Sequence, residues 1–320
     1  NKVPPALLMG NAVILKPASV NPLTLTRYVE LLVEAGVPAG VISVVHGSGS
    51  VVGKTLTSSK KVDMVSLTGS TAAGIDAAKN CADHCAHSSL ELGGNDAFIL
   101  CADGDMDLAI EETVWGRLYN TGQVCCASKR FLVENSVKDE FIRKMTDKIN
   151  SLKQGNPQDM STDIGCLVSE EAAIEVERQV NETIAAGATL VCGGKRNGAF
   201  YEPTILDNVT PDMEVAKDME IFGPVIPVIG FDDLEEAIEI ANKSIYGLSG
   251  SIITKDISKA IKVSEKMECG GFVINGASFF RSFEQPFGGW KYSGIGNEGI
   301  MTTLKEMSRT KTVILKNITK

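Results

Sequence analysis

Short apolar runs alternate with longer amphipathic stretches along the first hundred residues. Runs rich in β-branched side chains predict strands, and residues 23–35 predict an amphipathic helix. The predicted strands are 12–15, 41–45, 64–67, 88–92 and 97–100. Nearly continuous apolar strands separated by helices are typical of a parallel sheet covered on both faces. We therefore expect one α/β sheet in this region.

The same alternation continues to residue 274. Predicted helices cover 105–119, 137–152, 170–186, 234–242 and 257–267, and predicted strands cover 130–134, 189–191, 251–254 and 271–274. A chain of 320 residues is long enough for two cores. The pattern therefore predicts two α/β units in series.

Charge and hydropathy narrow the class of function. The formal net charge is -9, which argues against a nucleic-acid partner because phosphates require clustered Lys and Arg. No apolar run approaches the roughly 18 residues that span a bilayer, so no membrane association is expected. The first residues lack the basic and apolar regions of a secretory signal. A cytoplasmic enzyme is the default expectation.

The eight cysteines do not predict a disulfide framework, because the chain is large, acidic and without a secretory signal. Cys81, His84, Cys85 and His87 are spaced like metal ligands, but zinc sites usually combine two separated pairs and the sequence offers one. We predict no metal site. Instead, Cys81 and Cys85 are expected to share one face at the end of a helix that starts near Thr71.

Two glycine-containing turns are candidates for phosphate binding. Residues 47–53 resemble a dinucleotide fingerprint with one residue too many before the last Gly, and an ordinary strand–helix turn explains them equally well. Residues 68–74 follow a predicted strand, and Ser70 or Thr71 could cap the next helix. The N–H groups of such a helix start could bind a pyrophosphate, with Gly69 and Ser70 as contacts. A capped helix without a ligand is the alternative.

Five dispersed segments together resemble the aldehyde dehydrogenase superfamily, in order and in spacing. They are Leu67-Thr68-Gly69-Ser70, Leu90-Glu91-Leu92-Gly93-Gly94, Asn120-Thr121-Gly122-Gln123-Val124-Cys125-Cys126-Ala127, Glu220-Ile221-Phe222-Gly223-Pro224 and Pro286-Phe287-Gly288-Gly289-Trp290-Lys291-Tyr292-Ser293-Gly294. The resemblance implies a Rossmann-like cofactor-binding domain, incomplete at its N-terminus, at 1–94. It also implies an α/β catalytic domain at 95–300 and a tail with an oligomerisation strand at 301–320.

The resemblance also implies the chemistry. It places the nucleophile two residues after Gln123, at Cys125 rather than Cys126. The thiolate attacks an aldehyde to give a thiohemiacetal, which loses a hydride to the nicotinamide, and the resulting thioester is hydrolysed. Glu91 matches the general base for hydrolysis. A carboxylate in an apolar Leu–Glu–Leu run should have a raised pKa, which suits that role; a solvent-facing Glu91 is the alternative.

The cofactor contacts follow from the same resemblance. Glu220 and Phe222 match residues that hold the nicotinamide ribose and ring, and Lys16 matches the residue that hydrogen-bonds the adenosine ribose. Three positions after this Lys, family members that use only NAD are similar in having a Glu, and this chain has Ser19 there. Ser would not repel a 2′-phosphate. We therefore expect NAD or NADP.

Two regions of the sequence bear on the substrate. Residues 16–19 are similar to the corresponding stretch of succinate semialdehyde dehydrogenases. Those enzymes have an Arg that binds the substrate carboxylate just before the Asn of the cysteine segment, and this chain has Tyr119 there. Arg281, six residues before Phe287, falls where other members have pocket-lining aromatics. Arg281 and Phe287 are therefore candidate substrate contacts, with Arg281 facing a polar or anionic tail. A solvated loop position for Arg281 is the alternative.

Two further readings of the function compete with a hydrolytic aldehyde dehydrogenase. Relatives that transfer the acyl group to CoA are similar in the cysteine segment but typically lack the Glu, so Glu91 disfavours that reading. The chain begins at Asn1, just after the position where the family carries an oxyanion-hole Asn. We therefore expect a piece of a longer product, and a non-catalytic structural role is the second alternative.

The end of the chain predicts assembly. Residues 310–316 begin polar and become a short apolar β-run flanked by Lys, and such an edge is usually covered. In the family a similar tail pairs with a neighbouring subunit. We expect a homodimer or homotetramer, and the alternative is that the tail completes its own subunit's sheet.

Overall fold

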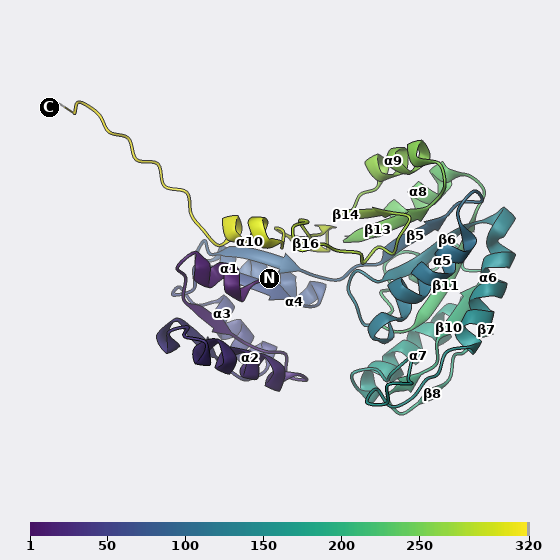
Figure 1. Ribbon diagram of the computed structural model, residues 1–320, viewed down its shortest axis with the longest axis horizontal. Coiled ribbons are helices and arrows are strands. Elements are labelled where there is room, and N and C mark those ends of the chain that lie inside the picture. Colours follow the sequence, from purple (N-terminus) through teal and green to yellow (C-terminus); the bar gives the residue numbers. More distant parts are fainter. Residues whose placement is uncertain (319–320) are drawn as a thin grey trace.

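The larger of two α/β units is built on a seven-stranded sheet (Figure 1). The structure is a computed structural model that describes residues 1–318. The strand order is β14-β13-β5-β6-β11-β10-β7, and every pair is parallel except β10 with β7. The strands are β5 (Asp96–Leu100), β6 (Ser128–Glu134), β7 (Thr189–Cys192), β10 (Thr204–Asp207), β11 (Val225–Phe231), β13 (Ser249–Ile253) and β14 (Gly271–Ile274).

Amphipathic helices cover both faces of this sheet with their apolar sides. They are α5 (Met106–Thr113), α6 (Asn135–Asn150), α7 (Glu170–Ala185), α8 (Leu234–Asn242) and α9 (Ile257–Lys266). One core cluster includes Phe98, Phe131 and Phe141, and a second on the opposite face includes Ile99, Leu132 and Val176; the three phenylalanines are fully buried. Strand residues that alternate between two buried faces explain why the apolar runs are nearly continuous. The expected α/β fold is confirmed.

The smaller unit contains most of the first 91 residues and a segment from near the C-terminus. Its elements are α1 (Val3–Leu8), β1 (Val13–Leu15), α2 (Pro22–Glu34), β2 (Ile42–Val44), α3 (Lys54–Thr57), β3 (Met64–Thr68), α4 (Thr71–Ala82), β4 (His87–Glu91), β16 (Gly294–Ile295) and α10 (Ile300–Glu306). Strands β1 and β2 pair only with each other, and β3, β4 and β16 form a separate sheet. Small two-stranded sheets pair β12 (Tyr246–Gly247) with β15 (Trp290–Lys291), and β8 (Arg196–Asn197) with β9 (Phe200–Tyr201).

The expectation of one parallel sheet over the first hundred residues is therefore wrong. Strand β5 joins the larger sheet, and the second neighbour of β4 is the antiparallel β16, with Gly294 opposite Glu91. The pairing of strands that lie about two hundred residues apart leaves no trace in local periodicity. This crossing brings the C-terminal segment beside Glu91.

The expectation that Cys81 and Cys85 share a helix face is also wrong. Helix α4 ends at Ala82, and Cys85 follows it with φ +57° and an exposed side chain. Cys81 is buried. A left-handed residue ends the helical periodicity, so the two thiols point to different surroundings.

The last described residues extend away from the body of the molecule (Figure 1). Residues 309–318 form no helix or strand, and Val313, Ile314 and Leu315 are 71%, 75% and 75% exposed. The described part of the tail, residues 309–318, therefore does not pair with a sheet of its own subunit. The final two residues of the predicted tail lie outside the described part. None of the described helices is long and apolar enough to cross a membrane.

Candidate active site

A strained turn precedes Cys125. The turn is η4 (Tyr119–Gly122), whose backbone is not helical at Asn120 and Thr121, and Cys125 lies between it and β6. Asn120, Thr121 and Gly122 have φ values of 50°, 57° and 76°. A Cβ on Gly122 would lie 2.3 Å from the carbonyl oxygen of Gly223, so this position requires glycine. Consecutive left-handed residues cost free energy and are found where the surrounding structure fixes a functional geometry.

Polar side chains within the same loop explain its remaining residue types. The Asn120 side chain donates to the Gln123 carbonyl (3.1 Å), and the Gln123 side chain donates to the Asn120 carbonyl (2.9 Å). The Gln123 side-chain oxygen also accepts from the Val168 N–H at 2.8 Å. These bonds fasten the turn to itself and to the adjoining loop, which fixes the approach to Cys125.

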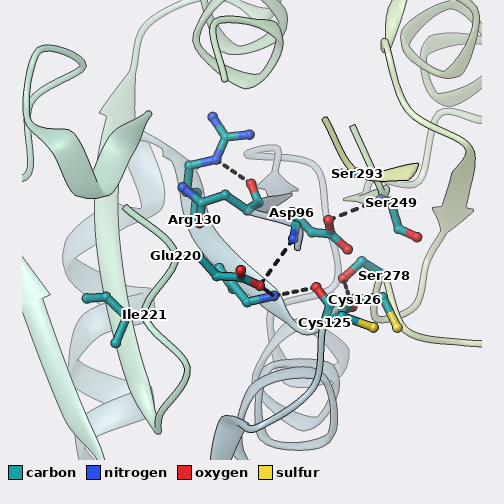
Figure 2. Close-up of polar contacts among 12 residues, drawn as sticks. Asp96, Cys125, Cys126, Arg130, Glu220, Ile221, Ser249, Ser278 and Ser293 are labelled. Atoms are coloured by element: carbon teal, nitrogen blue, oxygen red, sulfur yellow. Dashed lines mark hydrogen bonds and ion pairs between the residues drawn. The ribbon is translucent and has the colours of Figure 1, made fainter. Parts of the chain in front are cut away.

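The two adjacent thiols have opposite acidities. Cys125 is partly exposed and Cys126 is buried; Figure 2 labels both side chains. The pKa of the Cys125 thiol is lowered, first because the Cys126 side chain hydrogen-bonds to its sulfur and also because the Lys129 ammonium is close, although burial opposes this. The pKa of Cys126 is raised because it donates that bond and is buried. Cys125 is therefore the thiol suited to act as a nucleophile.

Glu91 ends β4 as a buried carboxyl. It is 3% exposed, and neither carboxyl oxygen has a hydrogen-bond partner among the described residues. Burial, together with the nearby charges of Glu298 and Cys125, raises the pKa of Glu91 to about 8. Lys2 and Arg281 act in the opposite direction. The alternative of a solvent-facing Glu91 is wrong, and the expected rise in its pKa is present.

Two charged residues that sequence reasoning missed lie beside Glu91. The Lys2 ammonium is 3.1 Å from a carboxylate oxygen of Glu298 and also donates to the Thr68 hydroxyl. The Glu298 side chain is 12% exposed and reaches this place through the pairing of its segment with the smaller unit. Both residues lie far from Glu91 in the sequence, so the local pattern of residues around Glu91 does not predict their proximity. Together they set the electrostatic environment of this carboxyl.

Glu220 and Phe222 lie on one rigid segment beside the cysteine loop. The Glu220 carboxylate accepts from the Gly94 N–H at 3.1 Å (Figure 2). Two buried guanidinium groups hold the backbone around it: Arg130 donates to Ala216, and Arg117 donates to Ile221 and Val225. Moving these carbonyl groups away would leave the buried guanidinium donors without partners, which costs free energy. They keep this segment in place.

Glu220 and Phe222 border a cleft that could receive a cofactor. The cleft has a volume of about 720 Å³, and Phe222 is 42% exposed. Its lining also includes Asn21, Asn120, Gln123, Cys166, Leu167, Val168, Ala172, Glu175, Val176 and Gln179. Because Asn21 comes from the smaller unit, the cleft lies between the two units. A few polar groups among apolar walls are typical of ligand sites.

The other predicted cofactor residues lie on the smaller unit. The Lys16 ammonium donates to the Pro17 carbonyl at 2.8 Å, and Ser19 is exposed in the turn that follows β1. Ser70 is the N-cap of α4 and accepts from the Ala73 N–H at 3.3 Å, which confirms the predicted cap. Gly69 is exposed next to it. The start of this twelve-residue helix is open to an anionic ligand.

The structure brings the two predicted substrate residues together. The Arg281 guanidinium lies 4.2 Å from the centre of the Phe287 ring. Its Nη2 is 3.8 Å from a Glu298 oxygen and has no hydrogen-bond partner in the described part of the chain. Arg281 lies in a loop and its side chain is 28% exposed, so it is only partly in contact with solvent.

Comparison with known proteins places these features in a family. The pattern of the aldehyde dehydrogenase family matches residues 1–313. A lactaldehyde dehydrogenase from Methanococcus aeolicus is 39% identical over 319 residues, covering 98% of this chain and 68% of that protein.

Two solved structures share the fold. A betaine aldehyde dehydrogenase double mutant from Staphylococcus aureus, in complex with NAD+, has a TM-score of 0.92 and 38% identity, covering 100% of this chain and 66% of that one. A glyceraldehyde-3-phosphate dehydrogenase from Methanocaldococcus jannaschii, complexed with NADP, has a TM-score of 0.93 and 39% identity. The match covers 99% of this chain and 69% of that one. This chain thus spans about two thirds of the length of these relatives.

Proposed function

The chain belongs to the aldehyde dehydrogenase family, whose members oxidise aldehydes with NAD or NADP, and we propose that Cys125 and Glu91 carry this reaction here. One observation carries the proposal: a thiol with a lowered pKa lies near a buried carboxyl that has a raised pKa and no hydrogen-bond partner among residues 1–318. The first group suits nucleophilic attack and the second suits proton transfer near neutral pH.

Each side chain has one task in the proposed sequence. The Cys125 thiolate adds to the aldehyde carbon, and the oxygen of the thiohemiacetal takes up the negative charge. A bound nicotinamide supplies the oxidising power by accepting the hydride from that carbon. Glu91 then removes a proton from a water molecule, whose oxygen attacks the thioester carbon. The carbon–sulfur bond breaks, which releases the carboxylic acid and regenerates the thiolate.

The cofactor residues fit either dinucleotide. Glu220 and Phe222 would hold the nicotinamide ribose and ring at the cleft, and Lys16 would hold the adenosine ribose. Gly69 and Ser70, at the start of α4, would meet the pyrophosphate. Ser19 places no carboxylate near the 2′ position, so a 2′-phosphate would meet no repulsion from this residue.

We propose that the substrate carries a polar or anionic tail facing Arg281. Its guanidinium is packed on Phe287 and has a nitrogen without a hydrogen-bond partner among residues 1–318. Arg281→Met should raise the KM of an aldehyde with a terminal carboxylate about tenfold or more, because a charge-assisted bond is lost. A neutral aldehyde of equal length is the control. An equal change for both substrates would contradict this assignment.

The nucleophile is tested by comparing the two thiols. Formation of reduced cofactor should be abolished in Cys125→Ala and largely kept in Cys126→Ala, measured on a panel of aldehydes with NAD and NADP. Equal loss in both variants would contradict the choice of Cys125. Full activity in the presence of CoA and none in water would instead favour acyl transfer.

Assembly and location complete the proposal. A homodimer or homotetramer is proposed, because the tail exposes three neighbouring apolar side chains and proteins usually cover such a segment. Light scattering of the protein with and without residues 309–320 tests this. A monomer at micromolar concentration, or an oligomer unchanged by the deletion, would contradict it. The proposed location is cytoplasmic.

A further inference from the structure

A fully buried ammonium group lies behind the nucleophile loop. Lys129, in β6, has a side chain that is 1% exposed. Its Nζ donates to the backbone carbonyl of Cys125, lies 3.2 Å from a carboxylate oxygen of Glu220, and is 5.8 Å from the centre of the Phe222 ring. One side chain thus contacts the residue proposed as nucleophile and both residues proposed to hold the nicotinamide half of the cofactor.

Glu220 is the carboxylate paired with this ammonium. The other carboxyl close to Lys129 is Asp96, which is 2% exposed and accepts from the Ser249 N–H at 3.0 Å. Burial raises the pKa of Asp96 to about 8, although Lys129 opposes the rise. Within the described part of the chain, Lys129 makes its ion pair with Glu220 and none with Asp96. A buried ammonium is costly unless paired, so Lys129 and Glu220 hold each other in place.

We propose that Lys129 is a positioning residue that ties the Cys125 loop to Glu220 and directs a positive charge at the Cys125 thiolate. The inference rests on the proposed roles of Cys125 and Glu220. Its physical content is that one ammonium favours the ionised form of the nucleophile and also holds the carboxylate that meets the cofactor. Without Lys129, Glu220 would keep its bond from the Gly94 N–H but lose its charged partner, and its negative charge would face the thiolate uncompensated.

A neutral tether in the same loop provides a matched comparison. The carbonyl of Cys126 accepts from the Ser278 hydroxyl at 2.9 Å, so neighbouring carbonyls are fastened by one charged group and one uncharged group. If fastening alone mattered, loss of either tether would have similar effects. If the charge matters, only the loss of Lys129 should change the acidity of Cys125.

The sign of the expected change follows from the groups around the thiol. Lys129 lowers the pKa of Cys125 and Glu220 raises it, while Cys126 lowers it through its hydrogen bond. Removing the ammonium should therefore raise the pH at which Cys125 ionises. Removing the charge of Glu220 should lower that pH.

The experiment measures alkylation of Cys125 by iodoacetamide between pH 5 and 9, without substrate or cofactor, with the site read by peptide mass spectrometry. Lys129→Met should move the midpoint upward by about one pH unit or more, and Lys129→Arg should restore part of that shift. Ser278→Ala should leave the midpoint unchanged. The KM for NAD or NADP should rise about tenfold in Lys129→Met, with a smaller change in kcat.

Two outcomes would overturn the inference. One is a Lys129→Met protein with a lower Tm but an unchanged alkylation midpoint and cofactor KM, which is the behaviour of a purely structural ion pair. If Lys129→Met does not fold, Glu220→Gln decides instead: its midpoint should fall, and an unchanged midpoint would contradict the electrostatic link. Because alkylation needs no turnover, a failure of the proposed dehydrogenase activity would be seen separately.

Discussion

Replacing Glu91 by Gln should remove a loss of stability that the protein suffers as pH rises. The carboxyl is 3% exposed and has no partner among the described residues, and burial raises its pKa from 4.5 to about 8. Between these values the unfolded chain has released the proton and the folded chain retains it. The folded state binds more protons, so stability is fully present below pH 4.5 and falls as pH rises towards 8.

The size of the effect follows from the two pKa values. Each tenfold change in proton concentration over this interval contributes about 1.4 kcal/mol, which gives an upper bound of about 5 kcal/mol for the whole interval. Between pH 5 and pH 8 the expected loss is about 3 kcal/mol. Glu91→Gln keeps the shape of the side chain and has no proton to lose, so the variant should not show this part of the pH dependence.

Urea unfolding of both proteins at pH 5, 6, 7 and 8 measures the difference in free energy of unfolding. The advantage of Glu91→Gln over the parent should grow steadily across this range. Glu265→Gln is the matched control, because it makes the same change at an exposed position on α9. A difference between Glu91→Gln and the parent that stays constant within about 1 kcal/mol would refute the burial argument.

Three further predictions concern cofactor choice, hydrolysis and the cysteine loop. The kcat/KM for NADP should be at least comparable to that for NAD. Ser19→Glu should raise the ratio of kcat/KM for NAD to that for NADP by about tenfold or more, because the new carboxylate repels the 2′-phosphate. A strong preference of the parent for NAD would show that other contacts decide the choice of cofactor. Turnover limited by thioester hydrolysis should rise with pH as Glu91 loses its proton near pH 8, and a flat profile from pH 6 to 9 would point to another base. Gly122→Ala should lower stability by about 2 kcal/mol or more in thermal unfolding, because its Cβ would meet the Gly223 carbonyl at 2.3 Å; an unchanged Tm would contradict the strain argument.

Features set by local chemistry could be predicted from the sequence. The cap at Ser70 follows from the residue type at a helix start, and it is present. The raised pKa of Glu91 follows from a carboxyl in an apolar run, because desolvation disfavours the charged form wherever that run is buried. The helix predicted over 23–35 agrees with α2 within one residue at each end, because its apolar positions recur with the period of an α-helix.

Features made by contacts between distant segments could not be predicted. Strands β10 and β11 lie in a stretch where no strand was expected, and the antiparallel β16 reaches β4 from two hundred residues away. Lys2 and Glu298 meet beside Glu91 only because of that crossing. Lys129 follows Cys125 by four residues, but its importance depends on Glu220, which lies far along the chain. Periodicity describes one element at a time and is blind to such pairings.

Mass spectrometry of the acyl-enzyme tests the central claim most directly. In Glu91→Gln the thiolate can still form the thioester but water activation is lost, so the intermediate should accumulate when aldehyde and NAD or NADP are added. Fragmentation of the peptide that contains both adjacent thiols should place one acyl group on Cys125, accompanied by one equivalent of reduced cofactor. An acyl group on Cys126, or a full equivalent of reduced cofactor with no acyl group on either thiol, would contradict the assignment of Cys125 as nucleophile and Glu91 as base.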